Sequence, residues 1–144
     1  MIAKAPIVRD CITTLILQIM AVPREIVSDD PEKVSYYTDI FDHANDEDLS
    51  IFLSRILQDT LSVPFGGAME VLRQSDGLLH SIYHVDGGTL APTYNEEYPF
   101  IQSDPKRTYN KVFFRPGDLV RIPWMMRSDP VSYTHLTLPT ILLV

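Results

Sequence analysis

The sequence has 144 residues, a formal net charge of −7, 45% hydrophobic residues and 22% charged residues. This length suffices for one compact domain with a modest core, and the average charged fraction excludes wholesale disorder. The acidic balance argues against a domain that wraps nucleic-acid phosphates. The single cysteine, Cys11, excludes an internal disulfide and a cysteine-rich zinc site, and its apolar neighbours predict a small buried side chain.

The longest apolar run near the N-terminus covers residues 12–22. It is about half as long as a membrane-spanning helix, which needs about 20 apolar residues. The run also lacks the basic start and small-residue cleavage site of a signal peptide. We therefore expect a soluble chain that is neither secreted nor bound to a membrane.

Helical periodicity appears in three segments. Residues 8–21 are predicted to form a helix whose wide apolar face is largely buried. A second helix is predicted over 31–44, after a short segment at 24–27 that is a candidate strand. The third, over 49–61, has apolar residues at i, i+3, i+4 and i+7, and it ends before Pro64 because the residue preceding proline avoids the α region.

Strand-like runs occupy the rest of the chain. Residues 68–73 and 78–85 flank Asp76-Gly77, and this dipeptide between two such runs is a strong hairpin signal. Further short strands are predicted, around a polar loop at 103–110, over residues 89–94, 98–102, 111–115 and 119–122. Helices followed by strands predict an α+β fold, in which N-terminal helices pack on a small, mostly antiparallel sheet of short strands.

His80, His84 and Asp86 are the first candidates for chemistry. In a strand, four residues span about 13 Å, so both histidines cannot hold one metal ion. We predict that they line the wetter face of a half-buried sheet. The glycine pairs at 66–67 and 87–88 lack the spacing of a phosphate-binding loop. We therefore expect no catalytic residue, metal or cofactor, while a small hydrolase or transferase using these three side chains stays open as the alternative.

One cluster combines basic and aromatic residues, and it consists of Lys106, Arg107, Tyr109, Lys111 and Arg115. Such a cluster can contact a nucleic-acid backbone, stack on a base or meet another subunit. It can equally be the outer face of a hairpin whose aromatic residues belong to the core. A host-encoded α+β binding module that uses this hairpin is therefore a further alternative.

The order and spacing of these segments resemble the N-terminal half of tailed-bacteriophage portal proteins. The similarity covers nearly all of residues 7–130 and includes Ala21-Val22-Pro23, the helix 49–61, and the segments 69–73, 84–92, 112–120 and 127–130. None of these motifs is catalytic. The chain departs from the family in having Pro64-Phe65 where many relatives turn through a small residue, which leaves the angle between helix and strand open.

The resemblance implies a structural protein, not an enzyme. Portal subunits form homo-oligomeric rings, usually of twelve copies, at one capsid vertex, where DNA passes without sequence-specific binding and the packaging ATPase (terminase) docks. Residues 1–130 would be an incomplete wing region, located in the virion and, during assembly, in the host cytoplasm. Contacts with terminase, capsid proteins and DNA would lie in regions after Pro130.

The last fourteen residues, 131–144, contain no acidic residue, lysine or arginine. Residues 131–140, VSYTHLTLPT, resemble the translation of one reading frame of a transposase-type sequencing adapter. This resemblance implies that the natural sequence ends near Pro130 and that 131–144 is a non-native tail. A genuine apolar C-terminal strand is the alternative.

Overall fold

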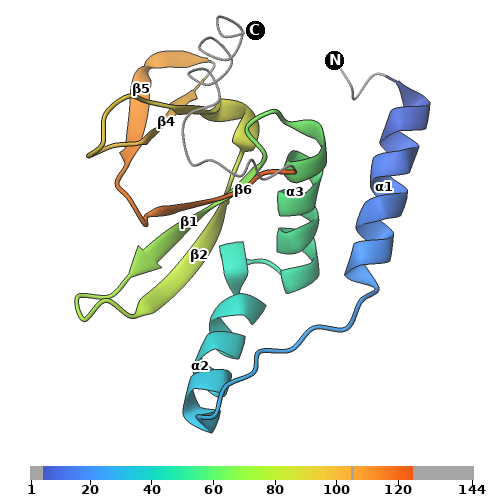
Figure 1. Cartoon of the computed structure of the whole chain (residues 1–144), viewed down its shortest axis with the longest axis vertical. Coiled ribbons are helices and arrows are strands. Elements are labelled where there is room, and N and C mark those ends of the chain that lie inside the picture. The colour runs from blue at the N-terminus through green and yellow to red at the C-terminus, as the bar shows by residue number, and fades with distance from the viewer. Residues whose placement is uncertain (1–4, 105, 125–144) are drawn as a thin grey trace, which may run out of the picture.

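The computed structural model of the chain describes residues 5–104 and 106–124, without the side chains of 107–109. Three α-helices come first, α1 (Pro6–Met20), α2 (Pro31–Asp42) and α3 (Leu49–Ser62). Six strands follow, β1 (Gly67–Arg73), β2 (Leu79–Val85), β3 (Leu90–Pro92), β4 (Phe100–Asp104), β5 (Arg107–Phe114) and β6 (Leu119–Ile122). This order confirms the predicted α+β class (Figure 1).

Local chemistry explains where two of the helices begin. The carboxylate of Asp30 accepts a hydrogen bond from the Glu32 N–H at 3.0 Å, and α2 starts with Pro31. The Asp48 carboxylate accepts one from the Ser50 N–H at 2.8 Å. Each N-cap satisfies a backbone donor that has no partner within the helix. The two helices are joined by the short 3-10 helix η2 (Ala44–Asp46).

The strands form two separate antiparallel sheets of three, with orders β2-β1-β6 and β3-β4-β5. The predicted hairpin is confirmed: β1 pairs with β2, and the turn between them uses Gly77 at φ 87°. A second 3-10 helix, η3 (Gly87–Thr89), leads from the first sheet to the second. The sequence pattern predicts the strands but not their division between two sheets.

Two apolar clusters hold these layers together. The first lies between α2, α3 and one face of the β1–β2 hairpin, and consists of Ile40, Ala44, Phe52, Ile56, Val71 and Ile82. The second joins the opposite face of the first sheet to the second sheet, and consists of Phe65, Ala68, Val85, Leu90, Phe114 and Leu119. The first sheet is therefore the middle layer, with the helices on one side and the second sheet on the other (Figure 1).

Helix α1 is less buried than its sequence predicts. It lies beside α3 at the edge of the molecule (Figure 1), and only Ile12 and Ile16 are buried. Cys11 is exposed, so the prediction that it is a buried hydrophobe is wrong. The physical reason is that a helix covered by a single neighbour buries only a narrow i, i+4 stripe, however wide its apolar face is.

Two predictions about strands are also wrong. Residues 24–27 belong to no strand and form part of the connection between α1 and α2. The expected loop over 103–110 is instead mostly paired, because β4 extends to Asp104 and β5 starts at Arg107. Polar side chains are tolerated in a strand that exposes one face, so polarity alone did not mark a loop.

Some predictions fall on residues that the structure does not describe. The segment 127–130 and the fourteen residues 131–144 lie outside the described part of the chain. Within the described part, no helix combines the length and hydropathy needed to cross a membrane.

Candidate functional site

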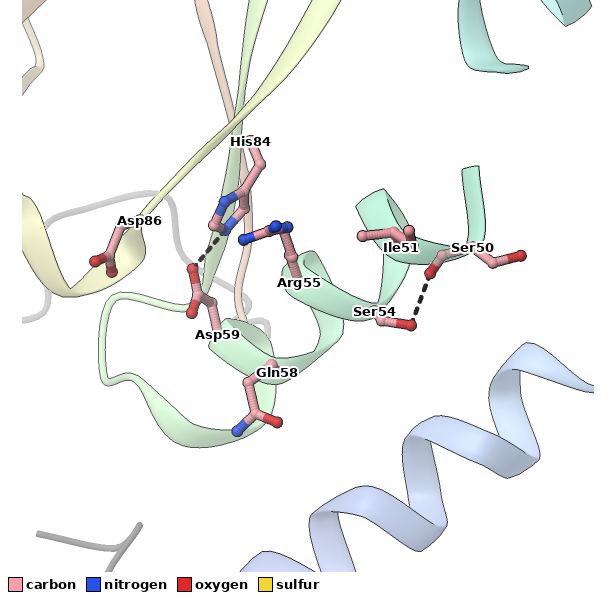
Figure 2. A pocket seen from close by; sticks show the side chains of 8 residues that line it. All are labelled: Ser50, Ile51, Ser54, Arg55, Gln58, Asp59, His84 and Asp86. Atoms are coloured by element: carbon pink, nitrogen blue, oxygen red, sulfur yellow. Dashed lines mark hydrogen bonds and ion pairs between the residues drawn. The ribbon is translucent and has the colours of Figure 1, made fainter. Parts of the chain in front are cut away.

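An open hollow of about 750 Å³ lies where α3 meets the end of β2. Polar and charged residues, with Ile51, line it: Ser50, Ile51, Ser54, Arg55, Gln58, Asp59, His84 and Asp86 (Figure 2). Six of these residues come from α3, because positions on one side of a helix recur every three to four residues. The other two come from β2 and the residue that follows it.

The central contact of the hollow joins Asp59 to His84. The His84 Nε2 atom lies 2.8 Å from the Asp59 Oδ2 atom (Figure 2). The same oxygen accepts the Gly87 N–H at 3.0 Å. The two side chains are only 15% and 16% exposed. One carboxylate on α3 therefore holds both β2 and η3.

A second ion pair lies beside the first. The Arg55 guanidinium donates two hydrogen bonds to the Glu47 carboxylate, at 2.8 and 3.0 Å. Hydrogen bonds from Asn45 and Arg55 lower the pKa of Glu47, so this carboxylate stays charged at neutral pH. Asn45 also accepts the His84 N–H at 3.2 Å. The polar contacts therefore run from η2 through β2 to α3.

The three residues predicted as candidates for chemistry do not converge. His84 lies on the same face of β2 as buried Ile82, towards α3, so its expected place on the wetter face is wrong. His80 is exposed. The Asp86 carboxylate caps η3 by accepting the Gly88 N–H at 2.8 Å. Within residues 5–104 and 106–124, no group of three or more His, Cys, Asp or Glu side chains is placed to hold a metal ion.

Asp59 is the residue of this hollow that the sequence pattern does not indicate. It lies seven residues after Phe52 and one before Thr60, beside the buried stripe of α3. A charged side chain beside the buried face of a helix is expected to have a polar partner, because burying an unpaired charge is unfavourable. The partner itself is 25 positions away, so the pattern within the helix does not identify it.

The chemistry available in the hollow is that of a histidine oriented by a carboxylate. This arrangement recurs in nucleophilic catalysis, where the second ring nitrogen activates a hydroxyl. Two hydroxyls line the hollow, but the Ser54 Oγ atom donates its hydrogen to the Ser50 carbonyl at 2.7 Å (Figure 2). The Ser54 hydroxyl is therefore engaged within α3, while the Asp59–His84 pair joins α3 to β2.

The residues of the predicted basic-aromatic cluster lie on or directly beside β5 of the second sheet. Lys106, Lys111 and Arg115 are exposed, while the side chains of Arg107 and Tyr109 lie outside the described part. Arg115 lies over the Tyr98 ring at 5.9 Å, and its hydrogen bond with Tyr98 raises the pKa of the guanidinium.

The two phenylalanines of β5 point to opposite faces of the second sheet. Phe114 is buried in the second cluster, whereas Phe113 is 53% exposed and packs edge-to-face on Tyr98. The aromatic residues of this hairpin are therefore divided between core and surface, as alternation along a strand requires.

No protein-family model matches the chain, and no curated protein matches it.

Proposed function

We propose that residues 1–130 are an incomplete wing region of a structural subunit of a phage portal ring, which packs against copies of itself. In this proposal the ring guides DNA during packaging and ejection without reading its sequence. Terminase and capsid proteins would bind other parts of the full-length subunit, in the virion and in the host cytoplasm during assembly. The observation that carries the proposal is an apolar surface on α1 with no covering element among the described residues.

This surface, the α1 flank, consists of Val8, Cys11, Leu15 and Ile19. The spacing i, i+3, i+7, i+11 places them in one stripe beside the buried pair Ile12 and Ile16. Val8, Leu15 and Ile19 are 38%, 41% and 42% exposed, and Cys11 is also exposed.

Three of the four flank residues, Cys11, Leu15 and Ile19, lie in the longest uncharged run of the described chain, residues 11–23. Water is a poor environment for such a surface, since burial of apolar area is favourable by about 25 cal/mol per Å². An apolar stripe of this kind is typical of a surface that meets another protein. A ring subunit provides such a neighbour at every position.

The experiment uses the full-length protein, expressed from the uninterrupted genomic reading frame that continues beyond Pro130. Native mass spectrometry and negative-stain electron microscopy should find closed rings of identical subunits. A full-length protein that stays monomeric at all concentrations, or forms a discrete dimer, would contradict the proposal.

A second candidate function rests on the Asp59–His84 pair in its open hollow. A carboxylate-oriented histidine can act as a general base in a small hydrolase or transferase. Under this alternative, His84→Ala abolishes turnover of an ester or phosphoester substrate while His80→Ala retains it. If the wild-type chain turns over none of a panel of ester and phosphoester substrates, this alternative is excluded.

The third candidate, a nucleic-acid-binding module, rests on exposed Lys106, Lys111 and Arg115. Binding of an oligonucleotide near the second sheet should change the fluorescence of Trp124, which is 65% exposed. Because phosphate contacts release counterions, the change should disappear at high salt. If the oligonucleotide does not change the fluorescence of Trp124 at low salt, this candidate is excluded.

A further inference from the structure

We infer that α1 is a releasable arm, which undocks from α3 and unfolds while the rest of the described fold stays intact. Its docking site is the side of α3 formed by Leu57 and Leu61. This property concerns a single copy of the chain and does not depend on ring formation.

Helix α1 takes no part in the two apolar clusters that hold the layers together. Ile12 and Ile16 are buried, yet no residue of α1 belongs to either cluster or to the side chains packed on it. The clusters consist of residues from Ile40 to Leu119, all of which follow α1 in the chain. Release of α1 would therefore leave the packing between α2, α3 and the two sheets unchanged.

No polar contact fixes α1 to another helix or strand of the described chain. Its threonine side chains donate within the helix, from Thr13 Oγ1 to the Arg9 carbonyl at 2.9 Å and from Thr14 Oγ1 to the Asp10 carbonyl at 2.8 Å. The ion pair of Arg9 is formed with the adjacent Asp10, at 3.8 Å. Docking of α1 therefore depends on apolar contact alone.

The docking site follows from the faces of α3. Ile56 is buried in the first cluster, towards the β1–β2 hairpin. Leu57 and Leu61 are half-buried, but they are not among the side chains that pack on either cluster. Because α1 lies beside α3 (Figure 1), it is the element that covers them. The spacing i, i+4 of this leucine pair matches that of Ile12 and Ile16 on α1.

Helix α1 has little stability of its own. Its N-cap, Ala5, makes no side-chain hydrogen bond, and no acidic residue in the first turn or basic residue in the last turn complements the helix dipole. An isolated helix of about 12–15 residues is marginal in water even with favourable residues. Undocking should therefore unfold α1 and expose its backbone amides. Seven of its 15 residues are β-branched and lose side-chain freedom in a helix: Ile7, Val8, Ile12, Thr13, Thr14, Ile16 and Ile19.

The connection between α1 and α2 is long and irregular enough to allow this release. Residues 21–30 contain no helix or strand, and all of them except Ile26 and Asp30 are exposed. Ten residues of extended chain can span about 33 Å. The arm can therefore leave α3 without displacing α2.

Native-state hydrogen exchange of the 144-residue chain tests the inference. Amides of residues 10–20 should be protected, yet they should exchange about 100-fold or more faster than amides of β1 and β2. Low concentrations of urea should accelerate the amides of β1 and β2 far more than those of α1, because the effect of urea scales with the surface that opening exposes. Absence of protection in α1, or protection equal to that of β1 and β2, would overturn the inference.

Val71→Ala decides whether α1 opens separately. Val71 is buried in the first cluster, so the substitution destabilises the core whether α1 is docked or released. Amides of β1 and β2 should then exchange about tenfold faster, whereas those of α1 should keep their wild-type rate. If both sets of amides accelerate equally, α1 opens only when the whole molecule unfolds, and the inference is wrong.

Ile16→Ala tests what holds the arm in place. Alanine favours a helix more than isoleucine does, so exchange of the α1 amides that is about tenfold faster would come from the lost apolar contact. Leu17→Ala is the matched control, because Leu17 lies on the same helix and is 66% exposed. Its α1 amides should exchange within about twofold of the wild-type rate.

Leu57→Ala tests the other side of the contact and should reproduce the effect of Ile16→Ala on the α1 amides. Protection of β1 and β2 verifies that the core of each variant is folded. Equal acceleration of the α1 amides by Ile16→Ala and Leu17→Ala, or no acceleration by Leu57→Ala, would overturn the inferred docking site.

Discussion

Asp59 has a larger structural role than any other carboxylate in the hollow, because one of its oxygens accepts hydrogen bonds from His84 and Gly87. Asp59→Ala removes the acceptor and leaves two partly buried donors without it. Loss of such contacts costs about 1–3 kcal/mol for each group left unsatisfied. We expect the free energy of unfolding, measured by urea denaturation, to fall by about 2 kcal/mol or more.

Asp76→Ala is the control for this prediction. Asp76 also accepts a backbone hydrogen bond, from the Leu78 N–H at 3.0 Å, but it lies in an exposed turn where water can replace it. Asp76→Ala should therefore lower the free energy of unfolding by well under half as much as Asp59→Ala does. Equal effects of the two variants would contradict the role assigned to Asp59.

His43 permits a prediction about pH. Its ring donates to the Asp39 carbonyl at 2.8 Å, and this backbone hydrogen bond, followed by the Asp39 charge, raises the pKa of His43. A raised pKa in the folded state means that protonated His43 stabilises the fold. That contribution is fully present below the ordinary histidine pKa and is lost as pH rises through the raised one.

The measurement is an NMR titration of the His43 ring, with the free energies of unfolding of wild type and His43→Gln compared across pH. Asp39→Asn keeps the main-chain carbonyl but removes the charge, so it should lower the His43 pKa only in part. A pKa that returns fully to its ordinary value in Asp39→Asn would show that charge alone causes the shift.

At the scale of elements, the corner between β2 and β3 depends on close packing around Gly87. A Cβ atom on Gly87 would lie 2.1 Å from the Gly66 carbonyl oxygen, which is backbone and cannot move aside alone. Gly87→Ala should therefore lower the free energy of unfolding by about 2 kcal/mol or more. The thermal midpoint, followed by circular dichroism, should fall with it.

The adjacent residue Gly88 is the matched control. Its nearest contact for a Cβ atom is the Asp86 Oδ1 atom at 3.1 Å, which belongs to a side chain that can shift. Gly88→Ala should cost about 1 kcal/mol or less, because a small rotation of Asp86 relieves the contact. If Gly88→Ala is as unstable as Gly87→Ala, the loss of stability comes from a change in the whole of η3 and not from the contact between residue 87 and the Gly66 carbonyl oxygen.

Elements with strong local signals were the predictable part of this fold. Asp48 as N-cap and the Val63-Pro64 break define α3, and Asp76-Gly77 defines the hairpin. The length of β4 and β5 was less predictable, because a pair of strands with one exposed face accepts polar residues. No local pattern reports how many neighbours a helix has, so the low burial of α1 was not predictable from its periodicity.

The candidate site was less predictable than the elements that form it. His84 could be recognised as a chemically capable residue, but its orientation towards α3 follows from the pairing register of β1 and β2. A shift of one residue would turn it to the opposite face. Asp59 becomes its partner only through the packing of α3 on that face, which is a tertiary effect over 25 positions.

At the scale of the whole molecule, β6 supplies the last buried residue and the last strand pairing of the described core. Leu119 is buried in the second cluster, and β6 pairs with β1 from Gly67 to Glu70. The Thr60 hydroxyl also donates to the Ile122 carbonyl at 3.1 Å. Every residue of the two core clusters therefore precedes residue 120, and the chain up to β6 contains the packing that holds the three layers together.

This distribution leads to a prediction about the proposed non-native tail. A chain that ends at Pro130 should unfold with the same free energy and midpoint as the 144-residue chain, because the packed clusters are retained. A chain that ends at Pro116 loses β6, exposes the edge of β1 and should not give a cooperative transition. Urea denaturation followed by Trp124 fluorescence compares the first pair, and circular dichroism follows the chain that lacks Trp124. If removal of 131–144 costs as much stability as removal of β6, the tail belongs to the native fold and its adapter origin is refuted.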